Sequence, residues 1–194
     1  MHETIWHGRG GQGVVIAAQT LAEAAYLEGF KGVTSAPTFG PERRGAPLTA
    51  STRISKEPIR IFSQIEYADV IVVLDETIFG VVDILSQAKQ GALILINSQL
   101  PPDKFDIAGP YRIATVDAVG IAMKHYLTKE GAPVINTPLL GAFSRITGLV
   151  SLDNVEKALK KKLSTETVMR NFAAVKMAYS ETVVNGGVGL NPPA

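Results

Sequence analysis

Two stretches of the sequence are apolar throughout, at residues 70–74 and 92–96. Strands have this composition when helices cover a parallel sheet on both faces, because neither face then meets water. Shorter strands are predicted at residues 3–7, 31–36 and 113–116. Gly, Pro or polar residues follow each run, so the pattern predicts buried strands separated by turns and helices.

After the strand predicted at residues 31–36, a different pattern appears, in which apolar and polar residues alternate. Leu48, Ala50, Thr52 and Ile54 fall on one face of a strand, and the intervening side chains fall on the other. This period of two indicates a half-exposed strand. We expect it to turn back and pair with residues 59–62 as an antiparallel hairpin.

Apolar residues at helical spacing predict helices over residues 13–28, 117–127, 137–146, 151–163 and 165–184. Asp117 and Ser151 stand where their side chains cap helix N-termini, and Gly29 stands where a left-handed residue ends a helix. The alternation of strands and helices predicts one α/β domain over residues 1–185, a three-layer Rossmann-like fold with a mainly parallel sheet and an antiparallel hairpin element. Gly and Pro predict an irregular tail over residues 186–194.

A glycine loop joins the first predicted strand to the first predicted helix. Gly8, Gly10 and Gly13 match the pattern G-x-G-x-x-G in that context, which is the context that gives the pattern meaning. Glycines allow a ligand to approach the backbone closely, and the free N–H groups of a helix N-terminus favour an anion such as phosphate. The loop is therefore a candidate site for a phosphate group.

Two other interpretations of the loop stay open at this point. A nicotinamide dinucleotide site usually has an acid at the end of the second strand, but residues 35–37 are Ser, Ala and Pro. The glycines are also compatible with a tight turn that binds nothing. Gly11 adds room and Arg9 adds a charge, which favours a phosphate ligand, and Gln12 can donate a hydrogen bond to ligand or protein.

The composition removes several classes of function. The chain of 194 residues carries 19 basic and 18 acidic residues, and this balance does not support nucleic-acid binding. It contains no cysteine, which excludes disulfides, thiolate catalysis and Cys-ligated iron–sulfur clusters in this chain. No apolar run approaches the roughly 20 residues of a membrane helix, and the first residues lack the order of a signal peptide. We expect a cytoplasmic protein without nucleic-acid or membrane partners.

Four motifs in order resemble the gamma subunit of pyruvate and related 2-oxoacid:ferredoxin oxidoreductases. They lie at residues 6–15, around the glycine loop, at 39–47, which read Phe-Gly-Pro-Glu-Arg-Arg-Gly-Ala-Pro, at 75–77, and at 136–142. The resemblance covers about residues 3–180, nearly the whole chain.

The resemblance implies a reaction that this chain does not complete alone. The family oxidatively decarboxylates a 2-oxoacid with coenzyme A, giving acyl-CoA, carbon dioxide and reduced ferredoxin. It implies coenzyme A as a ligand of this chain, whereas thiamine diphosphate, Mg and [4Fe–4S] clusters belong to partner subunits of the alpha, beta and delta types. The 2-oxoacid stays open, with pyruvate first. A free-standing NAD(P)-binding oxidoreductase and a non-catalytic assembly module are the alternatives.

The candidate residues form two groups, and none of them is assigned a catalytic or metal-binding role. The expected cofactor-binding residues are Gly8, Arg9, Gly10, Gly11, Gln12 and Gly13. The expected interface or ligand loop consists of Phe39, Gly40, Pro41, Glu42, Arg43, Arg44, Gly45, Asp75 and Glu76. For the two arginines we favour interface contact over ligand contact, and for Asp75 we slightly favour helix capping.

Overall fold

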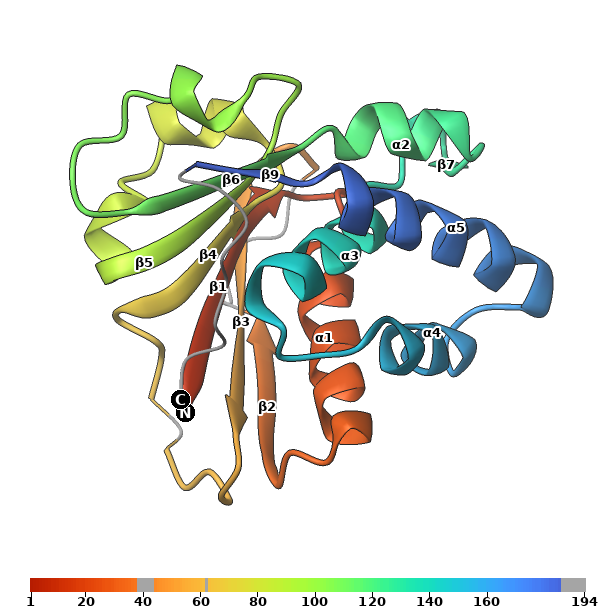
Figure 1. Ribbon diagram of the computed structural model, residues 1–194, viewed down its shortest axis with the longest axis horizontal. Coiled ribbons are helices and arrows are strands. Elements are labelled where there is room, and N and C mark those ends of the chain that lie inside the picture. Colours follow the sequence, from red (N-terminus) through yellow and green to blue (C-terminus); the bar gives the residue numbers. More distant parts are fainter. Residues whose placement is uncertain (38–43, 62, 186–194) are drawn as a thin grey trace.

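A seven-stranded sheet forms the centre of the computed structural model (Figure 1), which describes residues 1–37, 44–61 and 63–185. The strands of this sheet are β1 His2–Arg9, β2 Gly32–Pro37, β3 Pro47–Ser55, β4 Ala68–Val73, β5 Ala88–Asn97, β6 Arg112–Val116 and β9 Val183–Val184. A separate hairpin pairs β7 Thr128–Lys129 with β8 Ala132–Pro133. The α-helices are α1 Val14–Glu28, α2 Ala118–Lys124, α3 Asn136–Thr147, α4 Leu152–Lys160 and α5 Thr165–Glu181. Short 3₁₀ helices are η1 Glu76–Gly80, η2 Leu85–Gln87 and η3 Pro102–Lys104.

The strand order of the sheet is β2-β3-β1-β4-β5-β6-β9. The run β1-β4-β5-β6 is parallel, whereas β3 is antiparallel to both of its neighbours and β9 is antiparallel to β6. The prediction of an α/β fold with a mainly parallel sheet and an antiparallel element is confirmed.

The two faces of the sheet are covered in different ways (Figure 1). Helices α1, α3, α4 and α5 pack on one face, and η1, η2 and η3 with their connecting loops lie over the other. In β4, Val70 and Val72 face the α-helices, whereas Ile71 and Val73 face the 3₁₀ layer. Burial on both faces explains why residues 70–74 are apolar throughout.

The partner predicted for the alternating strand is wrong. Residues 59–61 form no strand, and residue 62 lies outside the described residues. β3 instead pairs along one side with β1 and along the other with β2. Both of its edges are therefore occupied, and Pro58, which has no N–H to donate, precedes the segment.

Most helix boundaries follow the predicted capping residues. The Asp117 carboxylate accepts from the Gly120 amide at the start of α2, and the Ser151 hydroxyl accepts from the Asn154 amide at the start of α4. Gly29 ends α1 with φ of 102°. The last helix ends before the predicted boundary at residue 184, because extended backbone at Thr182 leads into β9, which pairs with β6.

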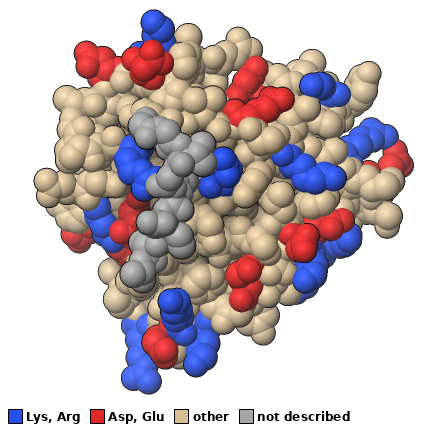
Figure 2. Space-filling model, in the orientation of Figure 1, with Lys and Arg blue, Asp and Glu red and all other residues tan. Residues whose placement is uncertain are grey.

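The remaining observations concern the surface charges, the hydropathy of the helices and the tail. On the face shown in Figure 2, basic and acidic side chains are interspersed. In the part of the chain that the structure describes, no helix has the length and hydropathy needed to cross a membrane. The predicted irregular tail at residues 186–194 lies outside the described residues.

Candidate functional site

The carboxyl ends of β1, β4, β5 and β6 open into a groove with a volume of about 1910 Å³. Its lining comes from the glycine loop (residues 8–13), the turn after β4, the start of α2, the β7–β8 hairpin and the facing ends of α4 and α5. From β1 the chain passes through α1 to β2 on one side, and β4 lies on the other side. Open α/β sheets bind ligands at such a switch point.

The glycines of the loop have separate structural roles. A Cβ atom at Gly8 would lie 2.5 Å from Val14 Cγ2, so glycine is required there for close packing of α1 on the strand. Gly11 and Gly13 have φ of 97° and 78°, the left-handed region that favours glycine. Together they turn the chain from β1 into α1 within a few residues.

Helix α1 begins with free backbone donors at the groove. The first hydrogen bond within the helix runs from the Ala17 amide to the Gly13 carbonyl. The amides of the three residues before it have no helical partner, no side chain of the described residues caps them, and the first turn holds no acid. Their dipoles favour a negative charge at this end of the helix.

The polar side chains of the loop bind other protein groups. Arg9 Nε donates to Asp75 Oδ2 at 3.1 Å, and Gln12 Nε2 donates to the same oxygen at 3.0 Å. Gln12 Oε1 accepts from the Arg9 amide at 2.8 Å. Arg9 also donates to Thr77 Oγ1 and to the Gly45 carbonyl. The structure thus brings Arg9, Gln12 and Asp75 together, and the charge of Arg9 is paired within the chain.

Asp75 also has the capping role that we favoured. Its Oδ1 accepts from the Thr77 amide at 3.0 Å at the start of η1. Burial alone would raise the pKa of the Asp75 carboxyl, but hydrogen bonds from Thr77 and Gln12 and the charge of Arg9 outweigh it, so its pKa lies below the ordinary value. The carboxylate is ionised at neutral pH and holds the two loops together.

The second predicted loop is described only at its end. Phe39, Gly40, Pro41, Glu42 and Arg43 lie outside the described residues. Gly45 donates from its amide to the Gly10 carbonyl at 3.1 Å, and Gly10 donates to the Ala46 carbonyl at 2.9 Å, so this segment lies along the glycine loop. Arg44 forms an exposed ion pair of 3.6 Å with Glu130 of the β7–β8 turn. Glu76 lies at the start of η1 and lines the groove.

Two asparagines in the groove were not assigned a role from the sequence. Asn97 Nδ2 donates to the Leu74 carbonyl at 2.9 Å, and its Oδ1 accepts from the Ala118 amide at 3.0 Å, which joins the end of β4 to the start of α2. Asn136, the first residue of α3, is 6% exposed and lies against Gly13. Asn97 directly follows the strand predicted at residues 92–96, and Asn136 directly precedes the helix predicted at residues 137–146. A polar residue at the boundary of a predicted element was the sequence feature that could have pointed to both.

His7 lies beneath the loop and does not reach the groove. Its residue is 1% exposed, and burial lowers the pKa of its imidazole to about 4, with a partial offset from Gln87. The ring is therefore neutral at neutral pH. Within the described residues, no group of three or more His, Asp or Glu side chains could hold a metal ion.

The strand order explains the missing acid of the dinucleotide pattern. β3 lies between β1 and β2, so the strand after α1 is not next to the glycine loop. Glu28 is engaged at the far end of α1, where it accepts hydrogen bonds from Ser151 and Asn154. The described residues offer no carboxylate in the place where a dinucleotide ribose is usually bound.

Comparison with known proteins identifies the family. Residues 3–181 match the family described as pyruvate ferredoxin/flavodoxin oxidoreductase. The chain belongs to this family. A relative from Thermococcus litoralis, named the pyruvate/ketoisovalerate oxidoreductases common subunit gamma, is 44% identical over 187 residues, which are 95% of this chain and 98% of the relative. Within the pyruvate ferredoxin/flavodoxin oxidoreductases, this chain is therefore of the gamma-subunit type, and the predicted resemblance is confirmed.

Solved structures of this oxidoreductase family share the fold. Subunit PORC of pyruvate oxidoreductase from Thermotoga maritima has a TM-score of 0.79 and 33% identity, with 95% of this chain and 98% of that chain covered. A 2-oxoglutarate:ferredoxin oxidoreductase from Magnetococcus marinus, solved with 2-oxoglutarate, coenzyme A and succinyl-CoA bound, has a TM-score of 0.73 and 19% identity. The match covers 92% of this chain and 30% of that one.

Proposed function

We propose that this chain binds part of coenzyme A as the gamma subunit of a multi-subunit 2-oxoacid:ferredoxin oxidoreductase, with pyruvate as the first substrate to test. The complex would form acyl-CoA and carbon dioxide and pass electrons to ferredoxin in the cytoplasm. Alpha, beta and delta-type subunits would carry thiamine diphosphate, Mg and the [4Fe–4S] clusters, since a chain without cysteine has no thiolate for a cluster. The isolated chain would be inactive.

One observation supports coenzyme A binding above the others, namely the free amides at the start of α1. They open into the groove at the switch point of the sheet, and no acid in the first turn competes with an anion. Coenzyme A carries phosphate groups, which helix N-termini bind through their N–H groups and dipole. The names of the relatives support the assignment to an oxidoreductase with further subunits.

A charge placed in the first turn of α1 tests this proposal. Ile16 is 51% exposed, lines the groove and belongs to that turn. In the assembled enzyme, Ile16→Asp should raise the KM for coenzyme A by about tenfold or more, because a carboxylate there repels phosphate and satisfies the free amides itself. The turnover number should change little, since the reacting groups would lie on other subunits.

Ile16→Asn is the matched control, because it has the same shape without the charge. An unchanged KM for coenzyme A in Ile16→Asp, in a complex of normal composition, would rule out a phosphate at this helix. The engagement of Arg9 and Gln12 by Asp75 favours a second candidate, an assembly module whose loop binds no ligand. That candidate predicts that both Ile16 variants keep the wild-type KM.

A further inference from the structure

Two helix N-termini meet at the floor of the groove. Helix α1 starts after Gly13, and helix α3 starts at Asn136, which lies against Gly13. Neither helix has a side-chain cap at its N-terminus, and neither has an acid in its first turn. The positive ends of two helix dipoles therefore lie together, and no acid in either first turn balances them.

Asn136 lies at this meeting point with its side chain unengaged. The residue is 6% exposed, and a Cβ atom at Gly13 would lie 2.7 Å from Asn136 Nδ2 and 2.9 Å from its Cγ. The carboxamide thus points at the residue that precedes α1, and it also lines the groove. No hydrogen bond joins it to another side chain or to the backbone among the described residues. The amide nitrogen and oxygen are not fully enclosed by protein, so the side-chain N–H can donate to a ligand in the groove.

The polar side chains that hold the loop in place do not have this freedom. Arg9 and Gln12 are held by Asp75, and Asn97 bonds to Leu74 and Ala118. Among the described residues, Asn136 lies beside the start of α1 with side-chain donors that no protein group engages. It comes from a part of the sequence distant from the glycine loop, and only the packing of α3 against α1 brings it there.

We propose that Asn136 is a ligand-binding residue, whose side-chain N–H donates to an anionic phosphate oxygen held at the N-termini of α1 and α3. This inference rests on the proposed binding of coenzyme A and adds the residue that recognises its phosphate. In this arrangement the backbone amides and Asn136 contact the anion, whereas Arg9, Gln12 and Asp75 hold the loop in shape without touching it.

Two substitutions in the assembled enzyme test the role of Asn136. Asn136→Ala removes the donor and should raise the KM for coenzyme A by about tenfold, since a hydrogen bond to a charged group contributes that much. Asn136→Asp should raise it further, because its carboxylate would occupy the place of the anion. The turnover number should be retained in both variants.

Thermal unfolding separates ligand binding from a packing role. Asn136→Asp should unfold at a temperature no lower than the wild type, because the new carboxylate faces two positive helix ends. Inorganic diphosphate, used as a probe without adenosine or pantetheine, should raise the unfolding temperature of the wild-type complex and leave that of Asn136→Asp unchanged. Gln19→Glu, on the exposed face of α1 outside the groove lining, is the control for a general effect of charge.

The outcomes distinguish this inference from the function on which it rests. If Ile16→Asp raises the KM for coenzyme A and both Asn136 variants keep the wild-type value, Asn136 is not a ligand-binding residue. A large fall in unfolding temperature and turnover together in both variants would make it a packing residue and overturn the inference. If neither position affects the KM, the binding of coenzyme A at α1 fails, and the inference fails with it.

Discussion

The two ends of β1 carry polar clusters of opposite character. Glu3 near the start and Arg9 at the end lie on the same face of the strand, about 20 Å apart at 3.3 Å per residue. At the first end, the charged side chains form ion pairs with one another. At the second end, the charges are also paired, but the amides of α1 and the side chain of Asn136 have no partner in the described chain.

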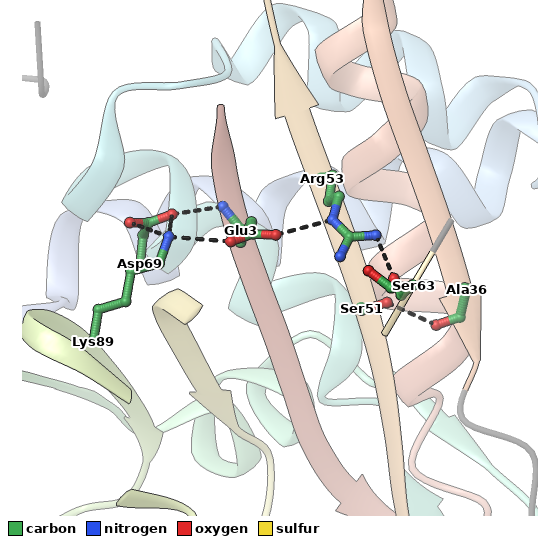
Figure 3. Close-up of polar contacts among 7 residues, drawn as sticks. All are labelled: Glu3, Ala36, Ser51, Arg53, Ser63, Asp69 and Lys89. Atoms are coloured by element: carbon green, nitrogen blue, oxygen red, sulfur yellow. Dashed lines mark hydrogen bonds and ion pairs between the residues drawn. The ribbon is translucent and has the colours of Figure 1, made fainter. Parts of the chain in front are cut away.

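Figure 3 shows the cluster at the amino end. The Glu3 carboxylate accepts from Arg53 Nε at 2.9 Å and from Lys89 Nζ at 3.1 Å. Lys89 Nζ also donates to Asp69 at 2.9 Å, and Arg53 donates to the Ser63 carbonyl at 2.8 Å. Two acids and two bases bind one another across β1, β3, β4 and β5, and this arrangement stabilises the sheet.

Charged residues by themselves are a poor guide to a ligand site in this protein. Each cluster contains an Arg in close contact with a carboxylate, Asp75 at one end and Glu3 at the other, and in both the charges largely cancel. What distinguishes the carboxyl end is the set of neutral donors, from the backbone and from one asparagine, that face a groove. The donors at the carboxyl end are available to the anion that we propose, whereas at the other end the donors already bind carboxylates.

Breaking the amino-end cluster should have the largest effect on stability. Glu3→Ala would leave the Arg53 guanidinium, 8% exposed, without its carboxylate partner, and this should lower the free energy of unfolding by about 3 kcal/mol. The matched variant is Lys89→Met. Because the Lys89 side chain is 38% exposed, this change should lower the free energy of unfolding by less than about 1 kcal/mol. Urea unfolding measures both. Equal costs would contradict the distinction between the buried and the exposed partner.

A buried histidine on the same face of β1 should make stability depend on pH. The pKa of His7 is about 4 in the folded chain and about 6.5 in the unfolded chain. The unfolded chain binds the extra proton between these values, so stability should fall by roughly 3 kcal/mol as the pH drops from 6.5 to 4. The difference between wild type and His7→Gln in urea unfolding at several pH values measures this. A difference that does not change with pH would mean that the ring has the same pKa in the folded and the unfolded chain.

The smallest effect concerns the ion pair that holds the glycine loop. Arg9→Ala and Asp75→Ala should each raise the KM for coenzyme A by several-fold, up to about tenfold, through displacement of the loop. Because both act through one contact, the double variant should show little more than either single one. Steady-state kinetics of the wild type, the two single variants and the double variant in the assembled enzyme provide this double-mutant cycle. Additive effects would show that one of the two residues contacts the ligand itself.

Local patterns in the sequence predicted most of the elements. The runs at residues 70–74 and 92–96 became β4 and β5, since apolar side chains on both faces fit only the middle of a covered sheet. Asp117 and Ser151 cap helices because their side chains reach amides a few residues away. These features depend on neighbours in sequence, and the pattern of a single chain contains them.

The sequence by itself therefore determined most of the elements, the glycine loop and the absence of thiolate chemistry, because each follows from side chains a few residues apart or from composition. The tertiary structure decided which strands pair with β3, which carboxylate pairs with Arg9 and which polar group faces the start of α1. Those outcomes join residues as far apart as Gly13 and Asn136. No local preference specifies such contacts, because they form only when helices and strands pack into one sheet and its covering layers.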